Sequence, residues 1–354
     1  MPDRPRLTPA IADVRRATRG ALDGLPADAL VLVGLSGGPD SLALAAALAF
    51  EAPRAGLRAG AVIVDHGLQS GSADVAARAA RQAAGLGLSP VLVERVSVGA
   101  RGSGAHGGGP HGSGANGGPE AAARAARYAA LERAASELDA SAVLLAHTLD
   151  DQAETVLLGL ARGSGAASLQ GMAAERAMQT ANGSFLRPLL GIRRTTTVQA
   201  CADAGLEPWT DPHNADPGFT RVRARQAVLP VLEAELGPGV AEALARTAEQ
   251  LREDTSALDS FAEEVVEDLA EHSEAGIALP ADALAANPPA LRQRIIRLAV
   301  SAEFGVALTR AQTLDVARLV TDWHGQDGVD LPGVRVVRRG GRLQFEARGT
   351  DGNA

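Results

Sequence analysis

The sequence has 354 residues, of which 46% are hydrophobic, 21% charged and 3% aromatic, and a formal net charge of −8. This length favours two domains, and the charge excludes a wholly basic nucleic-acid coat but not local patches of arginine, which supplies all 34 basic residues. One cysteine, Cys201, excludes an internal disulfide, and with no signal-like start or bilayer-spanning apolar run the sequence predicts a cytoplasmic protein without a membrane segment.

An amphipathic helix over residues 8–24 leads into the most informative stretch of the chain. Residues 30–35 are apolar, residues 36–41 read Ser-Gly-Gly-Pro-Asp-Ser, and an alanine- and leucine-rich helical pattern follows. Without β-carbons at Gly37 and Gly38, the backbone can turn sharply and direct several N–H groups at an anion, helped by the helix dipole. The pattern predicts a strand, a phosphate-binding turn and a helix.

Three side chains of this turn suit a nucleotide. The hydroxyls of Ser36 and Ser41 can donate hydrogen bonds to phosphate oxygens, and Asp40 is a hard oxygen ligand that could hold Mg²⁺. The spacing matches neither the kinase-type P-loop nor the dinucleotide-binding fingerprint.

A second strand is predicted over residues 60–64 and ends at Asp65 and His66. Ligands of open α/β sheets bind at the carboxyl ends of strands, so both residues are expected beside the phosphate loop. For His66 an ordinary loop histidine is an equal alternative. A helix over residues 73–86 and a strand over residues 90–96 follow.

Residues 99–119 are a low-complexity run of glycine, serine, alanine and histidine. Such a composition cannot bury enough apolar surface to offset chain entropy, so we expect a flexible insertion. A helix over residues 120–138 and a buried strand over residues 142–146 come next.

The stretch after this strand carries three chemically suggestive side chains. In a helix, His147, Asp151 and Glu154 would share one face, so an imidazole and two carboxylates would lie at the carboxyl end of a strand. Asp150 is a candidate N-cap that merely complements the helix dipole. The other three predict a functional cluster that faces the phosphate loop.

Farther along, arginines occupy every second position at Arg221, Arg223 and Arg225. An extended chain would place all three on one face that could follow phosphates, whereas a helix would spread them around its axis. A strand over residues 185–190 and a helix over residues 195–204 precede this run.

The last part of the chain predicts a second domain. Leucine or valine recurs every seven residues within a long amphipathic helix over residues 240–270. Residues 276–347 have the pattern of a small α+β domain, in which helices over residues 289–303 and 310–323 precede a hairpin over residues 334–345. Arg338 and Arg339 give this hairpin a positive tip.

Together these motifs resemble the tRNA(Ile)-lysidine synthase family of N-type ATP pyrophosphatases, the PP-loop superfamily. The resemblance is carried by residues 36–41, 64–68, 120–128, 146–165, 171–172, 187–190, 209–214 and 219–230. Their order and spacing are far more specific than the phosphate loop alone. The small domain resembles the substrate-binding domain of that family more weakly.

The resemblance implies an α/β fold with four parts. A parallel-sheet PP-loop ATP pyrophosphatase domain, which is Rossmann-like and adenine nucleotide alpha hydrolase-like, is expected at residues 1–218. A helical linker with a tRNA-contacting segment follows at 219–272, a small α+β tRNA-binding domain at 273–348, and a disordered tail at 349–354.

The implied activity is ATP- and Mg²⁺-dependent ligation of L-lysine to the wobble cytidine of the CAU-anticodon isoleucine tRNA. The reaction passes through an adenylated cytidine and releases pyrophosphate and AMP. The expected partners are this tRNA and lysine, with no membrane partner and with a homodimer left open. Two alternatives are another tRNA-modifying PP-loop ATP pyrophosphatase and a non-catalytic adenine-nucleotide sensor. A thiolase would need paired cysteines, and a sensor would not require the cluster around Asp151.

The resemblance also implies roles for individual residues. Asp40, His147 and Asp151 are the expected catalytic residues, with Asp40 and Asp151 as metal ligands and with Asp151 and Glu154 binding lysine. The expected ATP-binding residues are Ser36, Gly37, Gly38, Pro39, Asp40, Ser41, Asp65 and His66. The expected tRNA-binding residues are Arg124, Arg162, Arg221, Arg223, Arg225, Arg338 and Arg339.

Overall fold

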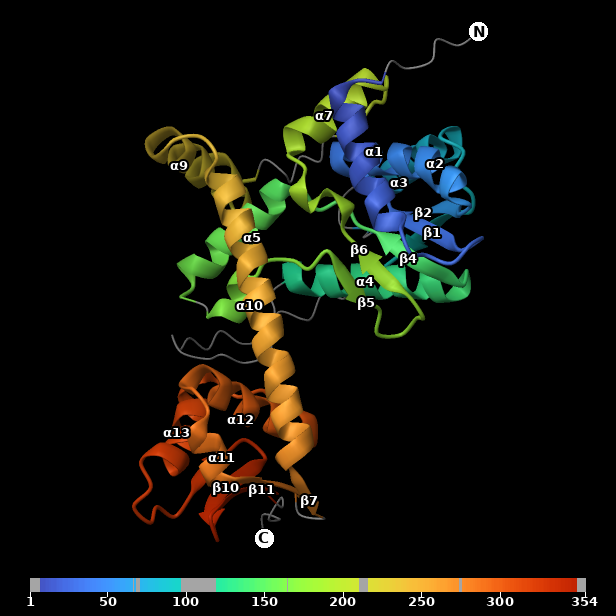
Figure 1. Ribbon diagram of the computed structural model, residues 1–354. Coiled ribbons are helices and arrows are strands. Elements are labelled where there is room, and N and C mark those ends of the chain that lie inside the picture. The colour runs from blue at the N-terminus through green and yellow to red at the C-terminus, as the bar shows by residue number, and fades with distance from the viewer. Residues whose placement is uncertain are drawn as a thin grey trace. The chain divides into compact units, whose positions relative to one another are not determined.

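The computed structural model describes residues 7–65, 67, 71–96, 119–163, 165–209, 216–273 and 276–348. The expectations for His66, for residues 99–118 of the insertion and for the tail after residue 348 lie outside these residues. The chain divides into two compact units, Met1–Glu249 and Gln250–Ala354 (Figure 1). The segment expected as one linker, residues 219–272, is divided between them, because its residues up to Glu249 pack with the first unit.

A six-stranded sheet forms the centre of the first unit, in the order β3-β2-β1-β4-β6-β5. Its strands are β1 (Leu30–Gly34), β2 (Arg58–Asp65), β3 (Val91–Arg95), β4 (Ala140–Leu144), β5 (Glu175–Ala177) and β6 (Ser184–Leu186). Neighbouring strands run parallel except for β5, which is antiparallel to β6. The predicted parallel α/β sheet is thus confirmed, and β1, β2, β4 and β6 end at one edge of it.

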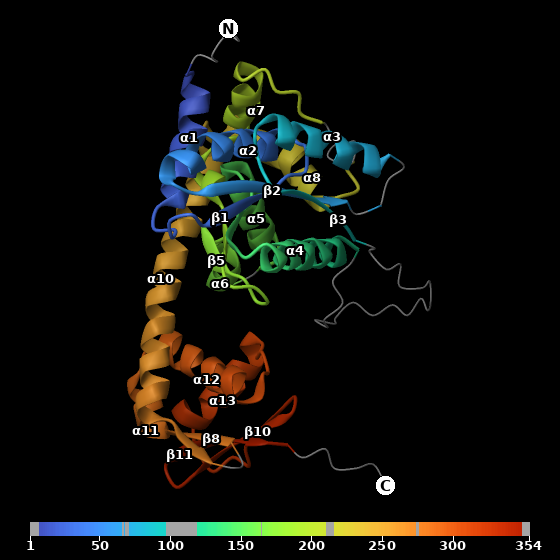
Figure 2. The ribbon, with the colours of Figure 1, turned by 90° about the vertical axis from the view of Figure 1, so that its right-hand side faces the viewer.

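Helices cover both faces of this sheet (Figure 2). The helices up to residue 269 are α1 (Pro9–Leu22), α2 (Pro39–Glu51), α3 (Ser72–Gly85), α4 (Pro119–Glu137), α5 (Leu149–Ala161), α6 (Ala166–Leu169), α7 (Arg194–Asp203), α8 (Thr220–Arg223), α9 (Leu229–Leu236) and α10 (Val240–Leu269), the last of which continues from the first unit into the second. Short 3-10 turns occupy Ala52–Ala55 and Pro188–Gly191, and a π-helical turn occupies Ala224–Val228. No helix of the described residues is long and apolar enough to cross a membrane.

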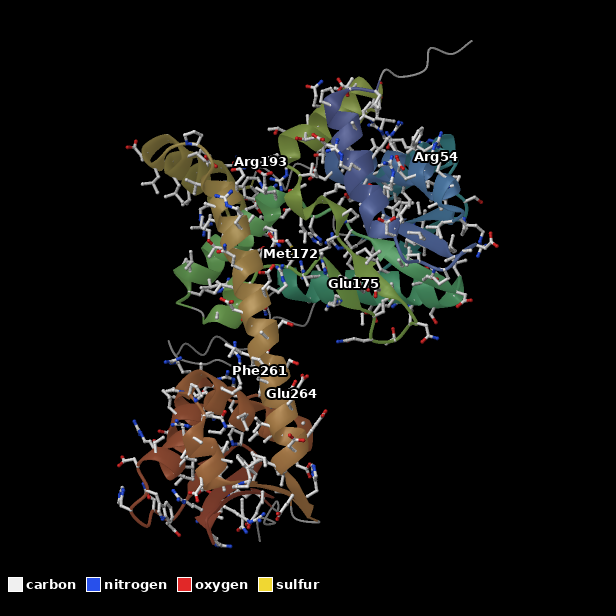
Figure 3. The ribbon with its side chains drawn as sticks, viewed as in Figure 1. Arg54, Met172, Glu175, Arg193, Phe261 and Glu264 are labelled. Carbon is white, nitrogen blue, oxygen red and sulfur yellow. The ribbon has the colours of Figure 1, made fainter. Side chains whose placement is uncertain are left out.

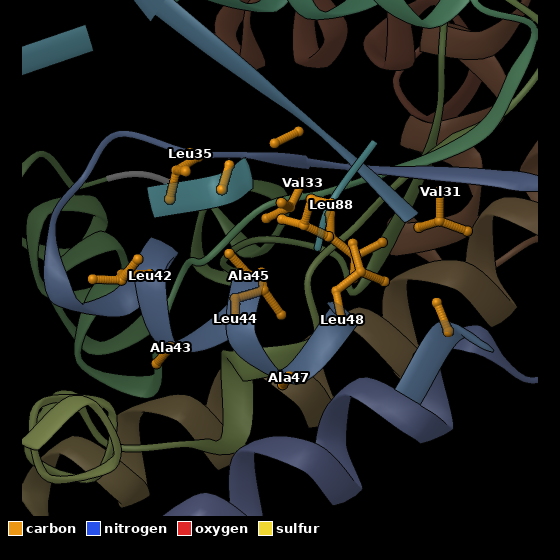
Figure 4. Close-up of a cluster of buried hydrophobic side chains, with 14 of the residues drawn as sticks. Val31, Val33, Leu35, Leu42, Ala43, Leu44, Ala45, Ala47, Leu48 and Leu88 are labelled. Carbon is orange, nitrogen blue, oxygen red and sulfur yellow. The ribbon is translucent and has the colours of Figure 1, made fainter. Parts of the chain in front are cut away.

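The side chains of β1 point alternately to the two faces of the sheet, which explains why helices cover both faces. Val31 and Val33 pack with Leu44 and other side chains of α2 (Figure 4), whereas Leu30 and Leu32 pack with side chains of α4 on the opposite face. Successive strand residues point to opposite faces, so an apolar run buries both. This packing holds the loop after β1 between two helical layers.

The structure changes one local expectation and decides one alternative that the sequence left open. The predicted strand over residues 185–190 ends at Leu186, because Pro188 begins a 3-10 turn. The arginine run is helical rather than extended, spanning α8 and the π-helical turn. Val222 and Ala224 are buried there, so apolar packing rather than the arginine spacing decides the conformation.

The second unit is an α+β domain built on an antiparallel sheet with the order β7-β8-β11-β10-β9. Its strands are β7 (Glu271–Ser273), β8 (Gly276–Pro280), β9 (Val329–Leu331), β10 (Val334–Arg339) and β11 (Arg342–Ala347), and its helices are α11 (Ala281–Ala286), α12 (Pro289–Phe304) and α13 (Arg310–Thr321). The β10–β11 hairpin is confirmed: Gly340 and Gly341 both have positive φ in its turn, and Phe345 is buried in the core.

Candidate active site

The loop between β1 and α2 has the geometry of an anion cradle. Gly37 has a φ of +83°, a conformation that favours glycine. The Ser36 backbone N–H donates to the Ser41 hydroxyl at 3.2 Å, and that hydroxyl lies 3.0 Å from the Gly38 carbonyl, so the loop is closed on itself. No side chain caps the N-terminus of α2 at Gly38, which leaves that end of the helix dipole open to an anion.

A cavity of about 390 Å³ opens beside this loop at the carboxyl edge of the sheet. Ser36 and Asp40 line it from the loop, and Asp65, Arg127 and His147 line it from β2, α4 and the end of β4. The volume lies within the range of small-molecule binding sites. The predicted crevice, shared by the ends of several strands, is therefore present.

Trp209 forms another part of the cavity wall. Its backbone N–H donates to the Gly37 carbonyl at 2.9 Å, so this part of the chain is tied to the phosphate loop although it lies far away in sequence. The half-buried indole adds an aromatic surface to the wall.

His147 lies before α5 rather than within it, because Thr148 is the N-cap of that helix. The expectation that His147, Asp151 and Glu154 share one helical face is therefore wrong, and so is the suggested N-cap role of Asp150. His147 instead lines the cavity, and its Nδ1 has no hydrogen-bond partner among the described residues. Burial, aided by nearby arginines, lowers the pKa of His147 to about 3, so the imidazole is neutral at pH 7.

Asp151 serves the helix and the site at once. Its Oδ2 accepts hydrogen bonds from the Thr148 backbone N–H at 2.8 Å and the Thr148 hydroxyl at 2.9 Å, which completes a capping box. Its Oδ1 lies 2.9 Å from the Arg194 guanidinium. Burial opposes ionisation, but Arg194, Arg221 and the helix-cap bond together lower the pKa of Asp151. The carboxylate is thus charged and oriented.

Glu154 is completely buried and surrounded by guanidinium groups. Its carboxylate oxygens lie 3.4 Å from Arg194, 2.8 Å from Arg221 and 2.7 Å from Arg225. Arg221 and Arg225, expected to contact tRNA, are directed at this internal carboxylate instead. A buried carboxylate needs such partners. Lysine binding by Glu154 remains a prediction, and here its oxygens hold arginines.

Arg194 connects this cluster with the cavity. Its Nε lies 3.4 Å from Asp40 Oδ2, while its other nitrogens contact Asp151 and Glu154. The Thr197 hydroxyl, also on α7, donates to Asp40 Oδ1. Burial raises the pKa of Asp40 in spite of these two partners. Asp40 therefore belongs both to the cavity wall and to the group of carboxylates that Arg194 bridges.

Arg193, which precedes Arg194 in the sequence, forms ion pairs with a different set of carboxylates. Its guanidinium lies 3.2 Å from Asp150, 3.3 Å from Glu233 and 2.8 Å from Glu242. These partners lie on α5, α9 and α10, which come together around Arg193 (Figure 3). Asp150 also accepts the Arg194 backbone N–H at 2.7 Å, so the start of α7 is fixed to α5.

The carboxylates suit a metal that arrives with a nucleotide. Among the described residues, no group of three or more histidine, cysteine or acidic side chains is placed to hold a metal ion. Mg²⁺, however, commonly takes one or two carboxylates and completes its shell with phosphate oxygens and water. Asp40 and Asp151, both bound by Arg194, provide such a donor pair.

Asp65 is a buried part of the cavity wall with local partners. It accepts the Gly67 backbone N–H at 3.0 Å and lies 3.5 Å from Arg95. Burial opposes ionisation, yet hydrogen bonds from Gly67 and Ser72 lower the pKa of Asp65. Pro39, also expected at the nucleotide site, is the first residue of α2.

The other expected tRNA-binding arginines differ in the exposure of their side chains and in the contacts that these side chains make. Arg124 and Arg162 are exposed, and Arg223 is exposed but donates to the carbonyls of the preceding turn at 2.6 and 2.9 Å. Arg338 donates to two backbone carbonyls of α13, at 3.0 and 3.3 Å. Arg339 is exposed and lies 3.8 Å from Glu346.

Four residues of the site were not assigned to it from sequence: Arg127, Arg194, Thr197 and Trp209. Arg194 and Thr197 follow β6, whose end lies at the same edge as the phosphate loop, so the strand-end argument could have found them. Arg127 lines the cavity without a hydrogen bond to the described residues, and burial lowers its pKa. Arg127 lies within residues 120–128, which carry part of the family resemblance, but that motif did not assign it a role.

A parallel sheet with a glycine-rich phosphate loop at its carboxyl edge and carboxylates beside it defines a nucleotide-binding protein of the PP-loop class. Residues 14–232 match the family model of the PP-loop domain, and residues 279–344 match that of the TilS substrate binding domain. The chain belongs to the tRNA(Ile)-lysidine synthase family, which confirms the resemblance noted from its motifs.

Two relatives illustrate the match. The chain is 65% identical over 318 residues to the tRNA(Ile)-lysidine synthase of Leifsonia xyli subsp. xyli, covering 90% of each chain. It is 53% identical over 334 residues to that of Thermobifida fusca, covering 94% of this chain and 95% of the relative. A U34-tRNA thiolase structure from Methanococcus maripaludis aligns with a TM-score of 0.54 at 20% identity, over 69% of this chain and 80% of that one, and shares the fold.

Proposed function

We propose that this protein ligates L-lysine to the wobble cytidine of the CAU-anticodon isoleucine tRNA, with ATP as the activating substrate. The observation that carries the proposal is the position of Asp40, which lines the cavity beside the phosphate loop and also contacts Arg194, the residue that holds Asp151 and Glu154. A nucleotide on the loop would therefore lie next to carboxylates suited to a cationic substrate. Membership of the lysidine synthase family supports the choice of substrates.

In the first step the cytidine carbonyl oxygen attacks the α-phosphate of ATP, and pyrophosphate leaves. Residues 36–41 hold the phosphates through backbone N–H groups and the dipole of α2. Asp40 and Asp151 would hold Mg²⁺, which would supply charge stabilisation on the phosphates. Because His147 is neutral, we assign it a hydrogen bond to the bound ligand rather than a charge interaction.

In the second step the lysine ε-amine attacks the adenylated carbon, the bond to the AMP oxygen breaks, and AMP leaves. The attacking amine must first lose a proton, and the α-ammonium and ε-ammonium groups of lysine require carboxylate partners. Asp151 is our first candidate partner. Glu154 can take this role only if a guanidinium moves away from it.

The remaining assignments complete the proposal. We place the catalytic domain at residues 1–218, the linker at 219–272 and the tRNA-binding domain at 273–348. We assign tRNA contacts to the exposed residues Arg124 and Arg162 and to Arg223 and Arg339. We also propose that the enzyme is cytoplasmic. Whether it is a monomer or a homodimer is a question for a measurement of its mass in solution.

The decisive experiment incubates the purified protein with ATP, Mg²⁺, labelled lysine and unmodified isoleucine tRNA transcript bearing CAU, with methionine tRNA as the matched control. We expect label in the isoleucine tRNA alone, together with AMP and pyrophosphate. Asp40→Asn should abolish transfer while the folded protein persists. ATP cleavage without lysine transfer would contradict the substrate assignment, and absence of any turnover would favour the nucleotide-sensor alternative.

A further inference from the structure

The arginines of the second unit differ sharply in whether they have a partner. Arg318, Arg335 and Arg348 form ion pairs with aspartates, and Arg339 and Arg342 form them with glutamates. Arg292 and Arg338 donate to backbone carbonyls. Arg294 lies 3.1 Å from Asp259, and Arg252 also has a partner. Of the arginine side chains in the described part of this unit, those of Arg297 and Arg310 alone make no hydrogen bond or ion pair.

These two unpaired arginines lie on two helices that pack against each other. Arg297 lies on α12, and Arg310 is the first residue of α13. Burial lowers the pKa of Arg297, and the charges of Arg294 and Arg310 lower it further. Asp259 is the one acidic group that opposes this effect, and it is already engaged by Arg294. The charges of Arg294 and Arg310 thus oppose that of Arg297, and the Asp259 carboxylate is the one acidic group that offsets them.

The burial of Arg297 gives the cluster its significance. A fully exposed arginine needs no partner, because water solvates it, but Arg297 is half-buried and has lost part of that water. An anion between Arg297 and Arg310 would supply the missing hydrogen bonds and relieve the repulsion. A capping box of Thr309 and Gln312 already satisfies two donors at the N-terminus of α13, so this end of the helix contributes only its dipole beside Arg310.

We propose that Arg297 and Arg310, with Arg294 beside them, form a site for a backbone phosphate of the substrate tRNA. The proposal rests on the proposed function for the identity of the RNA. It adds a second tRNA contact of this unit, on the surface formed by α12 and the start of α13, to the one assigned to Arg339 at the hairpin tip. Guanidinium groups in pairs suit a phosphate, since each can donate two hydrogen bonds to it.

The test measures binding of the isoleucine tRNA transcript by the full-length protein over a series of salt concentrations. Arg297→Gln and Arg310→Gln should each weaken binding about tenfold and lower the slope of log K against log salt by about 1. Arg297→Lys should recover part of the affinity because it restores the charge. Arg318→Gln is the matched control, since it removes one exposed, ion-paired arginine of the same unit, and its slope should match wild type.

Each outcome separates this site from the proposed function. Equal slopes for wild type, Arg310→Gln and Arg318→Gln would overturn the site, even if Arg297→Gln failed to fold, because Arg310 is exposed. Lysine transfer by wild type with no effect of either arginine leaves the function standing and removes the site. Binding that depends on both arginines, in a protein that transfers no lysine, retains the site and removes the function.

Discussion

Thr197 donates a hydrogen bond to Asp40, and the two residues are 157 positions apart in the sequence. The threonine is completely buried, on a helix that packs against the helix carrying Asp40. The hydroxyl therefore fixes one carboxylate oxygen, while Arg194 contacts the other. The orientation of the phosphate-loop aspartate is set from α7.

Removal of this hydroxyl should impair the site without disturbing the fold. Thr197→Val keeps the volume but leaves Asp40 Oδ1 without its donor, and we expect turnover to fall about 10- to 100-fold, with a higher Mg²⁺ requirement for ATP binding. Thr197→Ser should restore most of both. The control is Thr195→Val on the exposed side of the same helix. Equal Mg²⁺ dependence in calorimetric titrations of wild type and Thr197→Val would refute the positioning role.

Glu154 should be a major contributor to the stability of the first unit. Glu154→Gln leaves three guanidiniums facing a neutral amide, and breaking a buried ion pair from one side costs about 3–5 kcal/mol of unfolding free energy. The comparison is Glu207→Gln, since Glu207 is 88% exposed and lies 3.6 Å from Arg78. That exchange should cost less than about 1 kcal/mol. Urea unfolding measures both, and similar losses would contradict the interpretation.

His147 should make the protein less stable in mild acid. The pKa of His147 is lowered from 6.5 to about 3, so below pH 6.5 the unfolded chain takes up a proton that the folded protein refuses. This difference in proton uptake does not affect the free energy of unfolding above pH 6.5. As the pH falls from 6.5 toward 3, it lowers the free energy of unfolding by about 1.4 kcal/mol per pH unit. His147→Gln removes this titration. Unfolding free energies measured from pH 7 to 4 should therefore fall less steeply in the variant, and parallel curves would disprove the assignment.

Trp209 should report nucleotide binding through its fluorescence. The chain has two tryptophans, and Trp323 lies in the second unit. In Trp323→Phe, the indole of Trp209 in the cavity wall is therefore the one remaining source of tryptophan fluorescence. A non-hydrolysable ATP analogue with Mg²⁺ should change its emission in a saturable way. Trp209→Phe should remove the response while calorimetry still detects binding. A silent Trp209 in the presence of calorimetrically bound analogue would place the nucleotide outside this cavity.

Local patterns predicted the parts of the site that the chain builds over short distances. The apolar run, Gly37 and the helix after Asp40 are adjacent in sequence, so their pattern alone defines the turn. The strand-end rule then places Asp65 and His147 at the same edge. Even so, the start of α5 was misplaced, because Thr148 and Asp151 form a capping box that leaves His147 outside the helix.

Local patterns could not predict the contacts between segments that are distant in the sequence. Arg194 and Thr197 meet Asp40 only because α7 packs beside α2. The end of β6 places both residues at the right edge of the sheet, but it does not show which side chains they contact. For a similar reason, the pattern of the arginine run left the direction of its side chains open. Whether Arg221 and Arg225 point at RNA or at a buried carboxylate depends on Glu154, which lies 67 and 71 positions earlier.

The cations around Glu154 are all guanidiniums, and the whole chain contains no lysine. A guanidinium keeps its proton at every physiological pH, whereas an ammonium in a buried site can lose it and become a nucleophile. In a reaction that presents an activated base to an amine, a side-chain amine at these positions would compete with the substrate. The protein has no lysine side chain that could attack the activated base, so it cannot become linked to the substrate RNA through a lysine.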